Sequence, residues 1–254
     1  MGIKKLLAWG AHLYTATGLV AAAGIAVLLV RGGAESFRLA FFLMVIATAI
    51  DTTDGLLARK AKVKEFTPGF DGRRLDDLID FHTYTTLPLL FIWRAGILPA
   101  GQEWWLLLPL LASAYGFCQV QAKTADNYFL GFPSYWNIVG FYLYILKLPE
   151  WFSLGAIIVL ALLTFVPSRY LYTTHGGPFS LLTNVLGSAW GVSLILILVQ
   201  MPDVSGTLIY VSLIFPVYYM VLSWAITIRY WLGERRRELS LHYELSPDRA
   251  VSED

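Results

Sequence analysis

Long stretches without a single Asp, Glu, Lys or Arg residue recur along the whole chain. An α-helix needs about 20 mainly apolar residues to cross the hydrocarbon core of a bilayer. Because 57% of the residues are apolar and only 15% are charged, the composition excludes a water-soluble globule. Six predicted spans cover Ala11 to Val30, Trp104 to Ala122, Asn127 to Leu146, Trp151 to Ser168, Phe179 to Gln200 and Val204 to Ile228.

Two further apolar segments, Leu39 to Ile50 and Phe81 to Trp93, are too short to cross a membrane alone. They reach the required length only when the aspartates that flank them are included. We therefore predict an all-α, polytopic integral membrane protein with eight transmembrane helices. Intramembrane carboxylates are costly, so these two helices are the ones expected to carry the function.

The distribution of basic residues predicts the topology. With eight spans and the N-terminus inside, 15 of the 19 Lys and Arg residues fall in cytoplasmic segments. Both termini are then cytoplasmic, and a polar cavity faces the cytoplasm. Residues 1–232 are expected to form a single membrane domain that opens with a short interfacial segment at 1–10, and residues 233–254 a polar cytoplasmic tail.

The net charge of +1 and the single cysteine narrow the possible functions. A chain without a basic excess lacks the electrostatic footprint of a nucleic-acid-binding protein. One thiol, that of Cys118, cannot build a multi-thiolate zinc or iron–sulfur site within one chain.

Seven of the 18 acidic residues lie between Asp51 and Asp80. At about 100° per residue, helical geometry places most of them on two stripes. One stripe consists of Asp51, Asp54, Gly55 and Ala58, with Arg59 near its edge, and the other of Gly72, Asp76 and Asp80. Both stripes end at the cytoplasmic boundary, so four carboxylates are expected to converge there, while Asp77 points away.

Four converging carboxylates repel one another and favour divalent cations as compensation. All-oxygen ligands suit Mg²⁺ or Mn²⁺, and two such ions form a clamp for displacement at phosphorus. A cation transporter is the alternative class, because intramembrane aspartates can also bind a passing ion. The absence of a sequence repeat and the position of the acids at one interface favour the enzyme.

These residues resemble the signature of the CDP-alcohol phosphotransferases, Asp-x2-Asp-Gly-x2-Ala-Arg followed by Gly-x3-Asp-x3-Asp. The chain matches it from Asp51 to Arg59 and from Gly72 to Asp80, and it departs from it in a longer spacer of 12 residues, Lys60 to Asp71. The spacer, Phe70-Asp-Gly72 and the segment from Ala122 to Asn137 are similar to the bacterial phosphatidylcholine synthases. The resemblance covers the whole chain.

The resemblance implies transfer of the phosphatidyl group of CDP-diacylglycerol to choline, giving phosphatidylcholine and CMP, in the bacterial inner membrane. It implies two divalent cations, Mn²⁺ or Mg²⁺, and Asp80 as both a metal ligand and the general base. Homodimers are usual in the family. The implied metal ligands are Asp51, Asp54, Asp76 and Asp80, and the implied nucleotide-binding residues are Gly55, Ala58, Arg59, Gly72 and Thr17. Another acceptor, namely glycerol 3-phosphate, serine or inositol, is the alternative within the family.

Choline is a quaternary ammonium ion, and aromatic faces bind such cations. Candidates near Asp80 or on helices expected to face it are Tyr84, Tyr115, Tyr135, Trp136 and the polar Asn137. Lys123 and Arg169 are cytoplasmic-side cations suited to the lipid phosphate, although both also fit ordinary positive-inside residues.

Overall fold

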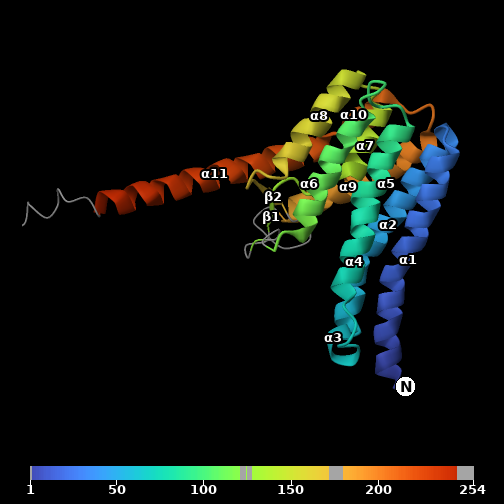
Figure 1. Ribbon diagram of the computed structural model, residues 1–254, viewed down its shortest axis with the longest axis horizontal. Coiled ribbons are helices and arrows are strands. Elements are labelled where there is room, and N and C mark those ends of the chain that lie inside the picture. The colour runs from blue at the N-terminus through green and yellow to red at the C-terminus, as the bar shows by residue number, and fades with distance from the viewer. Residues whose placement is uncertain (1, 121–123, 125–127, 172–179, 245–254) are drawn as a thin grey trace, which may run out of the picture.

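The computed structural model is mostly helical (Figure 1) and describes residues 2–120, 124, 128–171 and 180–244. In chain order its elements are α1 (Ile3–Arg31), α2 (Ala34–Lys60), α3 (Val63–Phe66), α4 (Gly72–Asp80), the π-helix η1 (Phe81–Thr86), α5 (Leu87–Arg94), the 3-10 helix η2 (Glu103–Leu106), α6 (Leu107–Cys118), β1 (Tyr128–Leu130), α7 (Trp136–Ile145), α8 (Glu150–Leu163), β2 (Arg169–Leu171), α9 (Ser180–Gln200), α10 (Gly206–Ser212) and α11 (Ile214–Glu244).

Four helical stretches within the described residues are long and apolar enough to cross a membrane, by length and composition. They are α1, α2, residues Leu181–Gln200 of α9, and Gly206–Arg237, which joins α10 to α11. The chain is therefore a helical membrane protein, as its sequence predicts. In Figure 1, α1 and α2 lie side by side, and α11 extends well beyond the bundle.

Helix α1 includes the residues predicted as an interfacial segment, and α11 extends past the predicted end of the membrane domain. Residues 3–10, predicted as an interfacial segment, are a continuous part of α1. At the other end α11 passes through Gly233, where the polar tail was predicted to begin, and runs on to Glu244. An ion pair of 3.5 Å between Glu234 and Arg237, three residues apart, supports the helix there.

The prediction of a purely helical chain is wrong in one detail, a short antiparallel pair of strands. Tyr128 of β1 lies opposite Leu171 of β2, and Leu130 opposite Arg169. Within the segment predicted as one helix from Asn127 to Leu146, the described residues therefore begin with the strand β1 at Tyr128, and α7 begins only at Trp136. Residues with positive φ, Gly131 at 80° and Ser134 at 55°, separate the two elements and cannot belong to a right-handed helix.

The strand pair is attached to α11 through side chains of that helix. The backbone N–H of Arg169 donates to Thr227 Oγ1 at 2.8 Å, and the N–H of Leu171 donates to Ser223 Oγ at 3.3 Å. Tyr219 completes the contact by donating its hydroxyl to the Leu171 carbonyl at 3.1 Å. These bonds satisfy backbone N–H and carbonyl groups on the outer edge of β2, which would otherwise lack partners.

Aromatic side chains hold α2, α5 and α7 together. Phe41 of α2 packs edge-on against Phe91 of α5 and Phe141 of α7, with ring centroids 4.6 Å and 5.0 Å apart. Phe37 and Tyr144 extend the same cluster by further edge-on contacts. Because edge-on aromatic pairs favour defined geometry, this core fixes the relative rotation of the helices that carry the site.

We expect Gly131→Ala to destabilise the protein by about 2 kcal/mol or more. A Cβ at this position would collide with the carbonyl oxygen of Thr164, and its backbone φ of 80° disfavours any L side chain. Gly155→Ala is the matched control, because Gly155 lies within α8 with no atom near its missing Cβ. Thermal denaturation in detergent should show a lower Tm for Gly131→Ala alone, and equal Tm values would contradict the strain argument.

Candidate active site

The helix that carries Asp76 and Asp80 is held against α1 by two close glycine contacts. A Cβ on Gly18 of α1 would lie 2.7 Å from Ile79 Cγ2 of α4. A Cβ on Gly72, at the start of α4, would lie 2.7 Å from His12 Cε1 of α1. Each helix thus contributes one glycine to the contact. The absence of a side chain at these two positions lets α1 and α4 approach closely, as small residues do at membrane helix interfaces.

The 12-residue spacer folds back onto α1 instead of extending into solvent. Buried Thr67 is within hydrogen-bonding distance of the His12 ring, with 3.0 Å between Oγ1 and Nε2. Phe70 packs on His12 and Trp9, with ring centroids 4.5 Å and 5.2 Å away. The spacer thereby connects α2 to α4 while keeping the start of α4 beside α1.

Asp51, Asp76 and Asp80 come together as one acidic group. Each contributes a carboxylate oxygen, and these atoms lie within 4.8 Å of one another. All three side chains are partly buried. Asp54, one turn after Asp51, is only 7% exposed and interacts electrostatically with Asp76. The structure therefore brings three of the four predicted carboxylates into one group and places Asp54 beside it.

The remaining acids of this hairpin have other partners. Asp77 is half exposed and pairs with Arg73 at 3.9 Å, so it points away from the group, in agreement with the helical stripes. Asp71 caps α4 by accepting the backbone N–H of Arg74 at 3.2 Å. A cap of this kind fixes where α4 begins and therefore the register of Asp76 and Asp80.

Tyr84 supports the acidic group directly. Its hydroxyl donates a hydrogen bond of 2.8 Å to Asp51 Oδ2. Tyr84 belongs to the π-helix η1, which starts immediately after Asp80. Single π-helical turns often occur at functional sites because their wider winding re-aims the side chains they carry. Tyr84, which the sequence suggested as a choline-binding residue, thus contacts a carboxylate of the acidic group.

The predicted nucleotide-binding residues lie on α1, α2 and α4, and α2 and α4 also carry the acidic group. On α2, Arg59 Nη1 lies 3.3 Å from the position of a Cβ on Gly55, so the guanidinium covers the glycine. Ala58 is on the same helix and partly buried. Thr17 is exposed on α1, with its hydroxyl donated to the Tyr14 carbonyl at 2.6 Å. Gly72 lies at the contact of α4 with His12.

The predicted choline residues are distributed over η1, α6 and α7, and both α6 and α7 contact η1. Tyr115 of α6 is 46% exposed and packs on Phe165. Trp136 is fully buried and donates its indole N–H to Ser113 Oγ at 2.8 Å. Tyr135, before α7, packs near Tyr219 with 6.1 Å between ring centroids, and the Asn137 side chain accepts the N–H of Ile138.

Arg169, one of the two cations predicted for the lipid phosphate, lies between aromatic rings. Its guanidinium carbon is 3.5 Å from the centroid of Tyr230 and 5.5 Å from that of Tyr128. Such cation–π contacts hold the side chain in place without neutralising its charge. The other predicted cation, Lys123, lies outside the described residues.

The donor set of the acidic group fits a hard divalent cation. Three carboxylates within 4.8 Å carry up to three negative charges in a partly buried volume, and opposite charge is the effective compensation. Carboxylate oxygens are the ligands preferred by Mg²⁺ and Mn²⁺. Asp51, Asp76 and Asp80 can therefore bind a metal ion.

Some supporting residues had no signal in the sequence. His12 and Thr67 are 55 residues apart and belong to no motif, yet their contact positions the spacer. Tyr84 was identified only as an aromatic residue one turn beyond Asp80, and nothing in the sequence indicated its bond to Asp51.

Known proteins provide an independent comparison. No family model matches the chain. It is 35% identical to a phosphatidylcholine synthase of Pseudomonas aeruginosa over 234 residues, which cover 91% of this chain and 96% of the relative. It is 34% identical to the phosphatidylcholine synthase of Legionella pneumophila, over 85% of this chain and 87% of the relative. The Borreliella burgdorferi phosphatidylcholine synthase is 36% identical over 67% of this chain and 72% of its own length.

The helical membrane fold, the acidic group and these relatives define a CDP-alcohol phosphotransferase. Identity of this extent over nearly the whole length narrows the class to one branch. The chain belongs to the phosphatidylcholine synthase family.

We expect Tyr84→Phe to weaken Mn²⁺ binding about ten-fold or more, because hydrogen bonds to the ligands of a metal hold those ligands in the orientation that binding requires. The variant removes the hydroxyl that donates to Asp51 and keeps the aromatic ring. Titration of Mn²⁺ by electron paramagnetic resonance, with no lipid substrate present, measures the effect. Tyr14→Phe is the matched control, since it removes a hydroxyl at the same 2.8 Å distance from an uncharged partner, Thr53. Equal Mn²⁺ affinities in the two variants would contradict the assigned role.

Proposed function

We propose that this protein is a phosphatidylcholine synthase that transfers the phosphatidyl group of CDP-diacylglycerol to choline and releases CMP. The observation that carries the proposal is the group formed by Asp51, Asp76 and Asp80 in a chain of this family. Carboxylates at this spacing suit metal-assisted chemistry at phosphorus. The aromatic residues around η1 suit a quaternary ammonium acceptor.

Two divalent cations, Mn²⁺ or Mg²⁺, are proposed at this site, with Asp51, Asp54, Asp76 and Asp80 as their ligands. When bound, the metal ions neutralise the pyrophosphate and stabilise the leaving CMP. Buried Asp54, next to Asp76, extends the donor set beyond the three oxygens that lie within 4.8 Å. A second ion needs such additional carboxylate oxygens.

Asp80 is proposed as the general base. Its carboxylate accepts the hydroxyl proton of choline while the choline oxygen attacks the phosphorus that bears diacylglycerol. The bond between that phosphorus and the bridging oxygen breaks in line, and the electron pair leaves with CMP. Asp80 lies one turn beyond Asp76 and directly before η1, so it can contact both the acidic group and the aromatic side of the site.

The cytidine nucleotide is proposed to lie along α2, next to Gly55, Ala58 and Arg59, with Thr17 and Gly72 at its margins. The planar guanidinium of Arg59 provides a fork for phosphate oxygens. Its position over Gly55 supports this proposal, because no side chain there separates the guanidinium from the backbone.

Choline is proposed to bind among Tyr84, Tyr115, Tyr135, Trp136 and Asn137. Tyr84 and exposed Tyr115 have the more direct support, since α6 packs against η1. Trp136, fully buried against Ser113, supports the wall of such a pocket. Arg169, fixed between two rings, and Lys123 are proposed to attract the lipid phosphate.

The proposed topology has eight crossings with both termini and the active site on the cytoplasmic side of a bacterial inner membrane. Besides the four long stretches, the crossings would be residues 72–94, residues 103–118, and the two segments that contain the shorter helices α7 and α8 together with the residues that flank them. Residues 1–232 would form the membrane domain and residues 233–254 the cytoplasmic tail. The proposed partners are membrane lipids and a second copy of the chain, and nucleic acid is not among them.

An acceptor other than choline is the remaining alternative. Glycerol 3-phosphate and serine carry anionic groups that need several converging cations, and inositol needs many hydrogen-bond donors. Helices α6 and α7, which contact η1, instead carry aromatic and neutral residues and no Asp, Glu, Lys or Arg, which favours choline.

The acceptor is tested by measuring CMP release from CDP-diacylglycerol labelled in the cytidine. The purified protein receives Mn²⁺ and, in separate reactions, choline, serine, inositol or glycerol 3-phosphate. We expect release only with choline, and loss of that release when EDTA removes the metal. Release with another alcohol would overturn the acceptor, and no release with any alcohol would overturn the transferase assignment.

Asp80→Asn should lower kcat for CMP release by at least about 100-fold, the range in which general bases contribute. Binding of CDP-diacylglycerol with metal should persist, because Asp51, Asp54 and Asp76 are unchanged. Asp77→Asn is the control on the same helix, since Asp77 pairs with Arg73 and points away from the group. Equal rates for the two variants would refute the base assignment.

A further inference from the structure

A cavity of about 580 Å³ lies at the end of the bundle away from the aspartates. Its lining comes from the start of α2, the residues after α5, the end of α7, and the connection from α9 to α10. Arg38 of its lining precedes Asp51 by 13 residues on α2, which is about 20 Å along a helix axis. The cavity is thus separate from the candidate active site.

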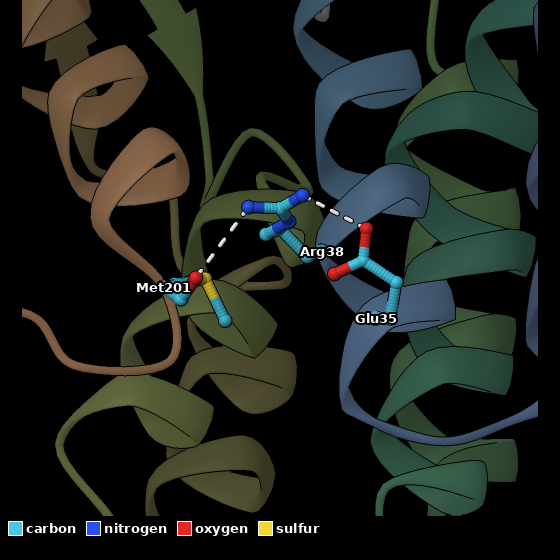
Figure 2. Close-up of polar contacts among 3 residues, drawn as sticks. All are labelled: Glu35, Arg38 and Met201. Carbon is cyan, nitrogen blue, oxygen red and sulfur yellow. Dashed lines mark hydrogen bonds and ion pairs between the residues drawn. The ribbon is translucent and has the colours of Figure 1, made fainter.

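Arg38 has hydrogen-bonding capacity that the protein does not use. Its Nη2 donates to Glu35 Oε1 at 2.8 Å, and its Nη1 donates to the carbonyl of Met201 at 3.4 Å (Figure 2). The second contact is longer than an ordinary hydrogen bond. An arginine side chain has five N–H groups, and its buried Nε has no hydrogen-bond partner within the described residues.

The charged groups of the lining balance one another. Arg38 and Lys147 carry positive charge, and Glu35 and Glu150 carry negative charge. Tyr144 adds an aromatic ring, and most of the remaining lining is apolar. A cavity with charged groups of both signs beside an apolar wall is complementary to a molecule that has the same three parts.

We propose that this cavity binds a zwitterionic glycerophospholipid. The phosphodiester lies at Arg38 and Lys147, the ammonium group at Glu35 and Glu150, and the glyceryl and acyl portions along the apolar wall. An anionic phospholipid fits less well, because its headgroup offers no positive charge to Glu35 or Glu150. Inorganic phosphate would leave the apolar wall exposed to water.

The test uses phosphatidylcholine with a photoreactive diazirine on one acyl chain, incorporated with the full-length protein into nanodiscs. Mass spectrometry then identifies the labelled peptides. We expect labelling of peptides from residues 34–38 and 143–150, with neither metal nor CDP-diacylglycerol present. The site can therefore be observed even if the proposed transferase activity is wrong.

Arg38→Gln and Lys147→Gln should each reduce this labelling about ten-fold, the effect of losing a hydrogen bond to a charged group. Arg31→Gln is the matched control, because Arg31 is exposed at the end of α1 and does not line the cavity. Arg38→Lys keeps the positive charge and should keep most of the labelling. This variant tests the role of the charge if Arg38→Gln fails to fold.

Competition distinguishes the ligand classes. Short-chain phosphatidylcholine should suppress the labelling, whereas short-chain phosphatidylglycerol and inorganic phosphate should not. Equal competition by phosphatidylglycerol would overturn the preference for a zwitterion, and competition by phosphate alone would overturn the lipid. Unchanged labelling in the Arg38 and Lys147 glutamine variants, or no labelling of these peptides, would overturn the site.

Discussion

Electrostatic repulsion among Asp51, Asp76 and Asp80 is the constraint on which the rest of this structure depends. Three carboxylates whose oxygens lie within 4.8 Å would separate if their helices were free to move, because like charges in a partly buried environment repel strongly. The fold opposes that separation. One carboxylate is on α2 and two are on α4, and both helices pack against α1.

Helix α1 performs this task without contributing an acid to the group. Gly18 accommodates Ile79, and His12 occupies the space that a side chain on Gly72 would need. The same histidine contacts Thr67, so the spacer between the two halves of the motif is attached to the helix that positions α4. The spacer therefore has a structural role, because its residues Thr67 and Phe70 pack on α1.

Tyr84 links the acidic group to the helices that carry the aromatic residues around η1. The hydroxyl contacts Asp51, and the ring belongs to a helix that α6 and α7 both contact. A single side chain can thus orient a metal ligand with its polar end and present an aromatic face with the other. The relatives identify the family. The hydrogen bond to Asp51 is the observation that suggests a role for Tyr84.

The sequence by itself determined the membrane class, the acidic motif and the family resemblance, because these depend on composition and on spacing along single helices. The tertiary structure decided which residues meet. It brought Asp51, Asp76 and Asp80 within 4.8 Å with Asp54 beside Asp76, placed Gly72 against His12 and buried Trp136 against Ser113. It also replaced the start of one predicted helix with a strand paired to β2, more than 35 residues later. Such contacts join residues far apart in the chain, and their distances follow from packing among helices, which local periodicity does not encode.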